Sequence, residues 1–184
     1  MKDQVSSSKC VRPDSSILLR LKEDYDGAEP SPNSISALNL LRLAEMMGKP
    51  EYRQTAENIF IAFSGRLAEA PNAMPQLLVA FDFFRNKPKQ IILAGKPGAS
   101  DTQAMLRAVH MRFIPNKIVL LADGGVGQEI LTRHLEFIKA VKPIDGKATA
   151  YICENFVCKQ PTNDLSTMIS LIIESETKQP SKKG

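Results

Sequence analysis

The sequence has no tryptophan, only three cysteines and two histidines, and no long apolar run. Its apolar stretches fall short of the roughly 18 residues needed to cross a bilayer, so no membrane partner is expected. The opening MKDQVSSSKCVRPDSS lacks the apolar core of a secretory signal, so we expect a soluble protein, in a compartment the sequence does not indicate. Three cysteines without paired CxxC spacing predict neither a zinc knuckle nor a disulfide framework, and no metal or other cofactor is expected.

The net charge of +4 is unevenly distributed along the chain. The segment 85–117 carries a net charge of +6, which leaves −2 for the rest of the chain. It holds one acid, Asp101, and seven basic residues: Arg85, Lys87, Lys89, Lys96, Arg107, Arg112 and Lys117. A nucleic-acid surface is one interpretation of such a segment. However, Phe113 is the one aromatic residue within it, and a helix-turn-helix pattern is absent. Solvated loops and helix ends are therefore favoured, and no nucleic-acid partner is expected.

The first half of the chain has the pattern of a helical array. Residues 1–16 are polar and serine-rich, and we interpret them as a disordered leader. Within residues 17–88, apolar side chains recur at helical spacing over 35–47, 51–70 and 74–84. Short connections predict that these helices pack as antiparallel hairpins. The first is apolar on almost every side, so other elements must cover several of its faces.

The second half, residues 89–173, has the pattern of a small α/β unit. Buried strands are expected at 90–94, 117–122 and 148–153, and helices at 101–112, 128–141 and from a capping Asp164 to residue 173. Strands that alternate with helices at this spacing predict a three-stranded parallel sheet with right-handed crossovers. Residues 174–184 are expected to be a disordered tail. The fold class is therefore mixed α and β, with helical hairpins followed by a parallel α/β portion.

The turn before the first helix carries four acids, Glu23, Asp24, Asp26 and Glu29. Paired carboxylates at the mouth of a helical cavity can act as acid and base. Solvated turn acids and helix caps are the alternative, because spacing across a turn leaves the direction of each side chain undetermined.

Other residues capable of chemistry are sparse. Cys153 and Cys158, separated by four residues, could close a disulfide, act as a redox pair, hold a metal with help from elsewhere, or remain structural thiols. Glycine-rich turns at 94–101 and 122–127 each join a strand to a helix, but neither spells a phosphate-binding motif, so tight turns are favoured. His110 and His134 lie on amphipathic helices, a position typical of partly buried or surface histidines.

Two motifs carry a family resemblance, RLKEDYDGAEPSPNSISALNLLRL at residues 20–43 and ATAYICENFVCKQPTND at residues 148–164. They resemble the C-terminal region of the spermatogenesis-associated protein 20 family, and the fit continues through KQIILAG, DTQAMLRAVH and IPNKIVLLADG. The resemblance implies a C-terminal part of a protein that pairs a thioredoxin-like domain with a helical toroid of the six-hairpin glycosidase and sugar 2-epimerase type. The thioredoxin motif Cys-His-Trp-Cys cannot occur here, because the sequence has no tryptophan.

By this resemblance, residues 17–88 are part of the α/α toroid and residues 89–173 a small appendage. The resemblance implies a link with fertility and with carbohydrate metabolism, with no activity expected of this chain alone. If the whole toroid acts on a sugar, Asp26, Glu29 and Asn33 are the candidate catalytic residues. The implied partners are the rest of the toroid, the thioredoxin-like domain and a sugar ligand. The alternative is a non-catalytic interaction or scaffold domain. In isolation, the uncovered helix at 35–47 predicts self-association.

Overall fold

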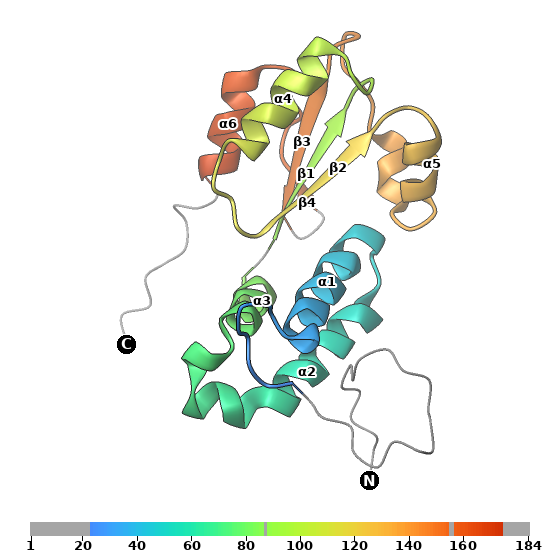
Figure 1. The fold of residues 1–184 in the computed structure, drawn as a ribbon. Helices are drawn as coiled ribbons and strands as arrows, with labels where there is room; N and C mark the ends of the chain where they lie inside the picture. Colours follow the sequence, from blue (N-terminus) through green and yellow to red (C-terminus); the bar gives the residue numbers. More distant parts are fainter. Residues whose placement is uncertain (1–22, 87, 155–156, 175–184) are drawn as a thin grey trace. The chain divides into compact units, whose positions relative to one another are not determined.

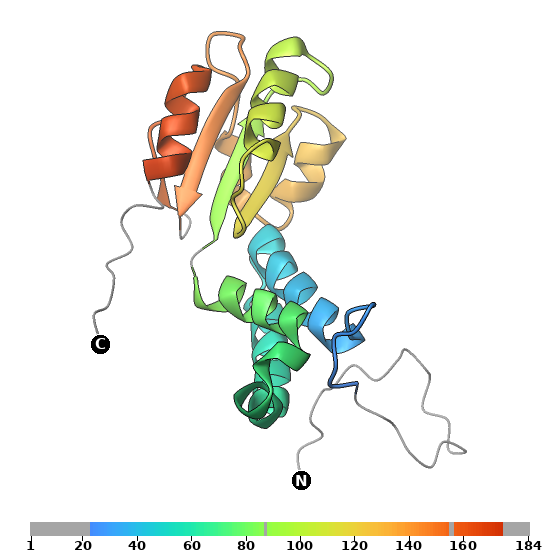
Figure 2. The same ribbon diagram turned by 60° about the vertical axis from the view of Figure 1, so that its left-hand side comes forward.

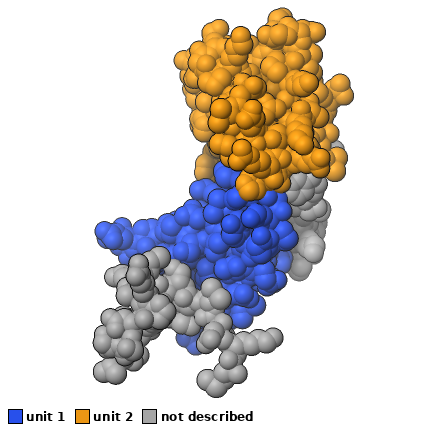
Figure 3. All heavy atoms as spheres, turned by 90° about the vertical axis from the view of Figure 1, so that its right-hand side faces the viewer, with its two compact units in different colours: residues 1–86 blue, residues 87–184 orange. Residues whose placement is uncertain are grey.

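The computed structural model describes residues 23–86, 88–154 and 157–174. The chain divides into two compact units, residues 1–86 and residues 87–184 (Figure 3), and each is described by itself. The predicted leader, the beginning of the predicted toroid segment and all but the first residue of the predicted tail lie outside the described residues.

The described part of the first unit is helical (Figure 1). Its elements are α1 (Pro32–Met47), α2 (Pro50–Glu69), the 3₁₀-helix η1 (Pro71–Ala73) and α3 (Pro75–Arg85). Each begins with a proline, whose missing N–H removes no helical hydrogen bond at that position. The first helix ends at Gly48, whose φ of 61° lies in the left-handed region and whose N–H donates to Ala44 O.

The core of the first unit forms where α1 packs against both α2 and α3. Buried side chains on the three helices form it: Ala37, Leu38, Leu41, Ala44, Ala56, Ile59, Phe60, Phe63, Leu77, Ala80 and Phe83. An aromatic contact joins α2 to α3, because the Phe60 ring meets the Phe81 ring edge-on with centroids 5.3 Å apart. Not all of α1 is covered, since Ile35 and Leu43 are each 39% exposed.

The second unit combines a sheet with helices on its faces (Figures 1 and 2). Its elements are β1 (Lys89–Ala94), α4 (Ser100–His110), β2 (Lys117–Ala122), α5 (Val126–Thr132), the 3₁₀-helix η2 (Glu136–Ala140), β3 (Thr149–Glu154), β4 (Val157–Cys158) and α6 (Leu165–Glu174). In both views α4 and α6 lie side by side on one face of the sheet. The core of this unit lies beneath them: Ile91, Leu93, Met105, Ala108, Val109, Ile114, Ala148, Ala150, Ile152, Met168 and Ile172.

The strand order is β2-β1-β3-β4. β1 is parallel to β2, but β3 runs antiparallel to β1, and β4 runs antiparallel to β3. The predicted mixed α and β class is confirmed. The predicted three-stranded parallel sheet is wrong, because the sheet has four strands with one parallel pair.

The connection between β2 and β3 explains the reversed strand. The single helix predicted over 128–141 is instead the short α5 followed by η2. The Gln128 side chain folds the two pieces together, because its Nε2 donates to Ile138 O at 2.8 Å and to Val141 O at 3.0 Å. Because α5 and η2 are short and folded together, they do not carry the chain back to the other end of the strands, as one long crossover helix would. β3 therefore starts where β2 ended, and Ala94 pairs with both the last residue of β2 and the first residue of β3.

Candidate functional site

Asp26 lies at the centre of the acidic turn, but its carboxylate is engaged by the main chain. The Ser31 N–H donates to Asp26 Oδ1 at 2.7 Å. The N–H groups of Gln76 and Leu77, in the first turn of α3, donate to Asp26 Oδ2 at 2.9 and 3.2 Å. Its own N–H donates to Ala73 O at 2.8 Å. The side chain is 7% exposed, so Asp26 caps α3 from a position 50 residues earlier in the sequence and joins that helix to the turn before α1.

The first turn of α1 is held by a second set of polar contacts. The Ser31 Oγ accepts the Ser34 N–H at 3.2 Å and lies 2.9 Å from the Ser34 Oγ. The Asn33 Nδ2 donates to Glu23 O at 3.2 Å. Asn33 is 1% exposed, and within the described part of the chain its Oδ1 has no hydrogen-bond partner. Ser31 caps α1, and the helix starts three residues earlier than the apolar pattern predicts.

The three candidate catalytic residues have different surroundings. Asp26 and Asn33 are buried and bonded to the main chain, whereas Glu29 is exposed. Within the described residues, no hydrogen bond or ion pair joins the three side chains. Their catalytic role stays a prediction, and the arrangement found for Asp26 and Asn33 is that of residues that hold a turn against two helices.

Cys153 and Cys158 form a disulfide in this structure. They are directly opposed in the register of the antiparallel strands β3 and β4, with Cα atoms 3.9 Å apart. Cys153 is fully buried and Cys158 is exposed. The antiparallel pairing of β3 with β4, which sequence reasoning missed, is what brings the two thiols together.

Carboxylates occupy both glycine-rich turns. Asp101 Oδ2 accepts the Ala148 N–H and its Oδ1 accepts the Thr102 N–H, both at 2.8 Å, and these main-chain bonds lower the Asp101 pKa. Asp123 Oδ1 accepts the N–H groups of Gly125 and Gln128, each at 2.9 Å, and these bonds lower the Asp123 pKa. The N–H groups of Thr102, Gly125 and Gln128, which a phosphate at these turns could use, are thus bonded to carboxylates of the chain itself.

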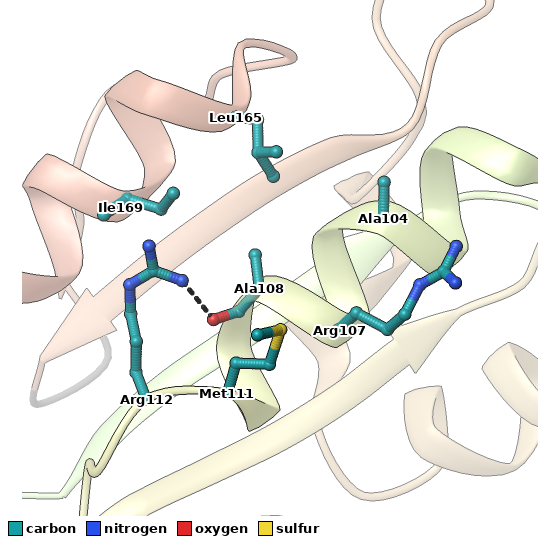
Figure 4. A pocket seen from close by; sticks show the side chains of 7 residues that line it. All are labelled: Ala104, Arg107, Ala108, Met111, Arg112, Leu165 and Ile169. Carbon is teal, nitrogen blue, oxygen red and sulfur yellow. Dashed lines mark hydrogen bonds between the residues drawn. The ribbon is translucent and has the colours of Figure 1, made fainter.

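A surface groove lies between α4 and α6 (Figure 4). Its volume is about 620 Å³, and its lining is apolar and basic: Ala104, Arg107, Ala108, Met111, Arg112, Leu165 and Ile169. The Arg112 Nη1 donates to Ala108 O at 2.6 Å, which holds one guanidinium at the edge of the groove. Met111 beside it is 84% exposed. The pairing of α4 with α6 creates this surface, so the sequence periodicity of either helix alone does not reveal it.

The basic segment identified in the sequence does not act as one solvated patch. Lys89 is 7% exposed, and its ammonium donates to Ile172 O in α6. The Lys117 Nζ donates to Val109 O at 3.1 Å and to Arg112 O at 3.3 Å, at the end of α4. These two cations therefore bind carbonyl groups within the second unit.

Two further kinds of site are absent from the described ranges. No group of three His, Cys, Asp or Glu side chains there is arranged to hold a metal ion. In the same ranges, no helix has the length and apolar content required of a membrane span.

Comparisons with known proteins identify relatives. No family model and no solved structure matches the chain. Over 146 residues the chain is 42% identical to spermatogenesis-associated protein 20 of Rattus norvegicus and of Homo sapiens, a match that covers 79% of this chain and 18% of each relative. An uncharacterized protein of Caenorhabditis elegans is 30% identical over 158 residues, which are 86% of this chain and 21% of that protein. The matches thus span about a fifth of the length of these relatives, and over most of its own length the chain is homologous to a part of spermatogenesis-associated protein 20.

Proposed function

We propose that the chain is a non-catalytic, partner-binding part of a protein related to spermatogenesis-associated protein 20. The observation that carries the proposal is the engagement of Asp26. Both of its carboxylate oxygens accept main-chain N–H groups, three in all, from the turn before α1 and from α3. A general base needs a carboxylate oxygen that can reach a substrate proton, and these contacts leave Asp26 in a structural role instead.

Two surfaces support a binding role. On α3, the apolar residues Leu78, Val79 and Phe81 are 38%, 52% and 38% exposed. On the second unit, the groove between α4 and α6 offers an apolar floor with Arg107 and Arg112 at its edges. Exposed apolar side chains next to charged ones are typical of surfaces that bind other proteins.

The length of the relatives suggests what these surfaces contact. We propose that α1, α2 and α3 belong to a larger α/α toroid, and that the remaining helices of that toroid and a thioredoxin-like domain are the partners. The mammalian relatives carry spermatogenesis in their name, which supports a role connected with fertility.

The test of partner binding is self-association of the 184-residue chain. An apolar surface that lacks its partner should make the chain associate with itself, and sedimentation velocity would detect this as a mass that rises with concentration. Val79→Glu places a charge on the exposed face of α3 and should lower the association. Val126→Glu, at a site that is 71% exposed in the second unit, is the matched control and should leave it unchanged. A chain that stays monomeric at all concentrations, with or without Val79→Glu, would contradict the proposal.

A sugar-active role is the second candidate, and it is favoured by Asn33. Its Oδ1 is buried without a hydrogen-bond partner among the described residues, near in sequence to the exposed Glu29. If a sugar binds at this turn, a panel of monosaccharides and disaccharides should raise the melting temperature of the chain. The increase should disappear in Glu29→Gln and persist in Asp24→Asn. The non-catalytic proposal predicts no increase with any sugar.

A further inference from the structure

The disulfide between Cys153 and Cys158 lies at the edge of the sheet. β4 is the last strand in the order, and its two residues are both exposed. Cys153 has no exposed surface, whereas the Cys158 side of the bond faces solvent. The two sulfur atoms therefore differ in their access to an external reagent.

The bond is also placed away from the main core of its unit. Side chains alternate between the faces of a strand, and Ala150 and Ile152 of β3 point into the core beneath α4 and α6. Cys153, the next residue, therefore lies on the opposite face of the sheet. Breaking the bond does not remove a contact from the core that holds α4 and α6.

Hydrogen bonds hold the paired segment without help from the disulfide. The Lys159 N–H donates to Ile152 O at 2.9 Å, and Ala150 and Thr162 exchange both of their main-chain hydrogen bonds, at 2.7 and 3.1 Å. The side chain of Lys159 adds a contact with α6, because its Nζ donates to Leu171 O at 3.2 Å. After reduction, these contacts keep the segment beside β3, with the Cys158 thiol still opposite its partner and ready to form the bond again.

We propose that this pair is a thiol–disulfide exchange site in which Cys158 is the sulfur that is attacked and Cys153 is the sulfur that leaves. A thiolate of an external thiol attacks the Cys158 Sγ and forms a mixed disulfide. The bond to Cys153 breaks, and the Cys153 Sγ leaves with the electron pair and takes a proton from water. A second external thiol then displaces Cys158, so that two external thiols are oxidised to one disulfide and the protein pair is reduced.

This site is independent of the proposed partner-binding role, and it differs from a purely structural disulfide in two measurable ways. It requires that the two sulfur atoms react unequally, because one is exposed and the other is buried. It also requires that the reduced chain remain folded. A structural bond needs neither property.

The first experiment uses oxidised glutathione as a small disulfide probe of each thiol, with Cys10→Ser in every variant so that the adduct forms on the pair alone. Cys153→Ala leaves Cys158 free, and Cys158→Ala leaves Cys153 free; alanine avoids placing a hydroxyl in the buried position. With oxidised glutathione, intact mass spectrometry should show an adduct that forms about tenfold faster, or more, on the free Cys158 than on the free Cys153, because thiol reactivity follows exposure. Equal rates, or faster reaction of Cys153, would overturn the assignment.

The second experiment needs no substitution in the pair, so it does not depend on how the alanine variants fold. The Cys10→Ser chain is equilibrated with mixtures of reduced and oxidised glutathione and quenched with acid. Peptide mass spectrometry should locate the mixed disulfide on Cys158, and far-UV circular dichroism should be unchanged in the reduced chain. A pair that stays oxidised at the highest ratio of reduced to oxidised glutathione, or a chain that unfolds when reduced, would overturn the proposal.

Discussion

Replacing Asp26 by alanine should lower the free energy of unfolding of the first unit far more than replacing a neighbouring acid does. The carboxylate accepts the buried N–H groups of Ser31 and Leu77 and the partly buried N–H of Gln76. A buried donor left without an acceptor costs about 1–3 kcal/mol, so the three together should lower the free energy of unfolding by about 4 kcal/mol. Asp26→Asn keeps one acceptor oxygen and should lower it by about 2 kcal/mol.

Urea unfolding followed by far-UV circular dichroism measures the decrease in the free energy of unfolding. Amide hydrogen exchange shows which residues lose protection. In Asp26→Asn, the amides of Gln76 and Leu77 should exchange faster than in the unchanged chain, because their acceptor is weakened. Asp24→Asn is the matched control. Asp24 lies in the same turn but is 53% exposed and 3.4 Å from the Arg66 Nε, and exposed ion pairs contribute only about 0.2–1 kcal/mol. If Asp26→Ala behaved like this control, the structural role of Asp26 would be refuted.

Three further predictions concern α6, the end of β1 and α2. Asp164 caps α6, and hydrogen bonds from the Ser166 hydroxyl and the Thr167 N–H lower its pKa to about 2. Its contribution to stability should therefore be present above its ordinary pKa and lost as the pH falls towards 2, and a carboxyl NMR titration with an ordinary midpoint would contradict this. Gly95→Ala should destabilise the chain by about 1–3 kcal/mol in urea unfolding, because its Cβ would lie 2.3 Å from the Thr102 Oγ1; an unchanged midpoint would show that the helix can shift. Gly65→Ala within α2 meets no atom within 4 Å and should raise stability by about 0.5–1 kcal/mol, so a loss would mean that the helix there is distorted.

The helices of the first unit could be predicted because their signals are local. Prolines mark the starts of α2 and α3, and Gly48 marks the end of α1. Each acts through the backbone of its own turn, so the sequence places the boundaries within a few residues. The one larger difference, the earlier start of α1 at Pro32, follows from the Ser31 cap, which the apolar pattern does not register.

The direction of β3 could not be predicted from alternating strands and helices. It depends on whether residues 128–141 form one helix long enough to cross the sheet. The apolar pattern there fits one helix, but Gln128 bonds to Ile138 O and Val141 O and folds the segment back. Such side-chain contacts over ten or more residues carry no signal in hydrophobic periodicity.

Prediction of the candidate site from the sequence was limited for the same reason, because the site depends on long-range contacts. Four acids in one turn look alike in sequence, and what singles out Asp26 is the start of α3, 50 residues away. The pairing of Cys153 with Cys158 likewise depends on the direction of β4. Sequence could name these residues as candidates but could not assign their contacts.

We propose that the turn before α1 is a structural element and does not bind a substrate. Titration of the ¹⁵N-labelled chain with a mixture of monosaccharides and disaccharides tests this most directly, read at the amides of Gly27, Glu29 and Asn33. We predict that these resonances do not move at any sugar concentration. Saturable shifts at these amides, abolished by Glu29→Gln, would contradict the claim and favour the sugar-active role.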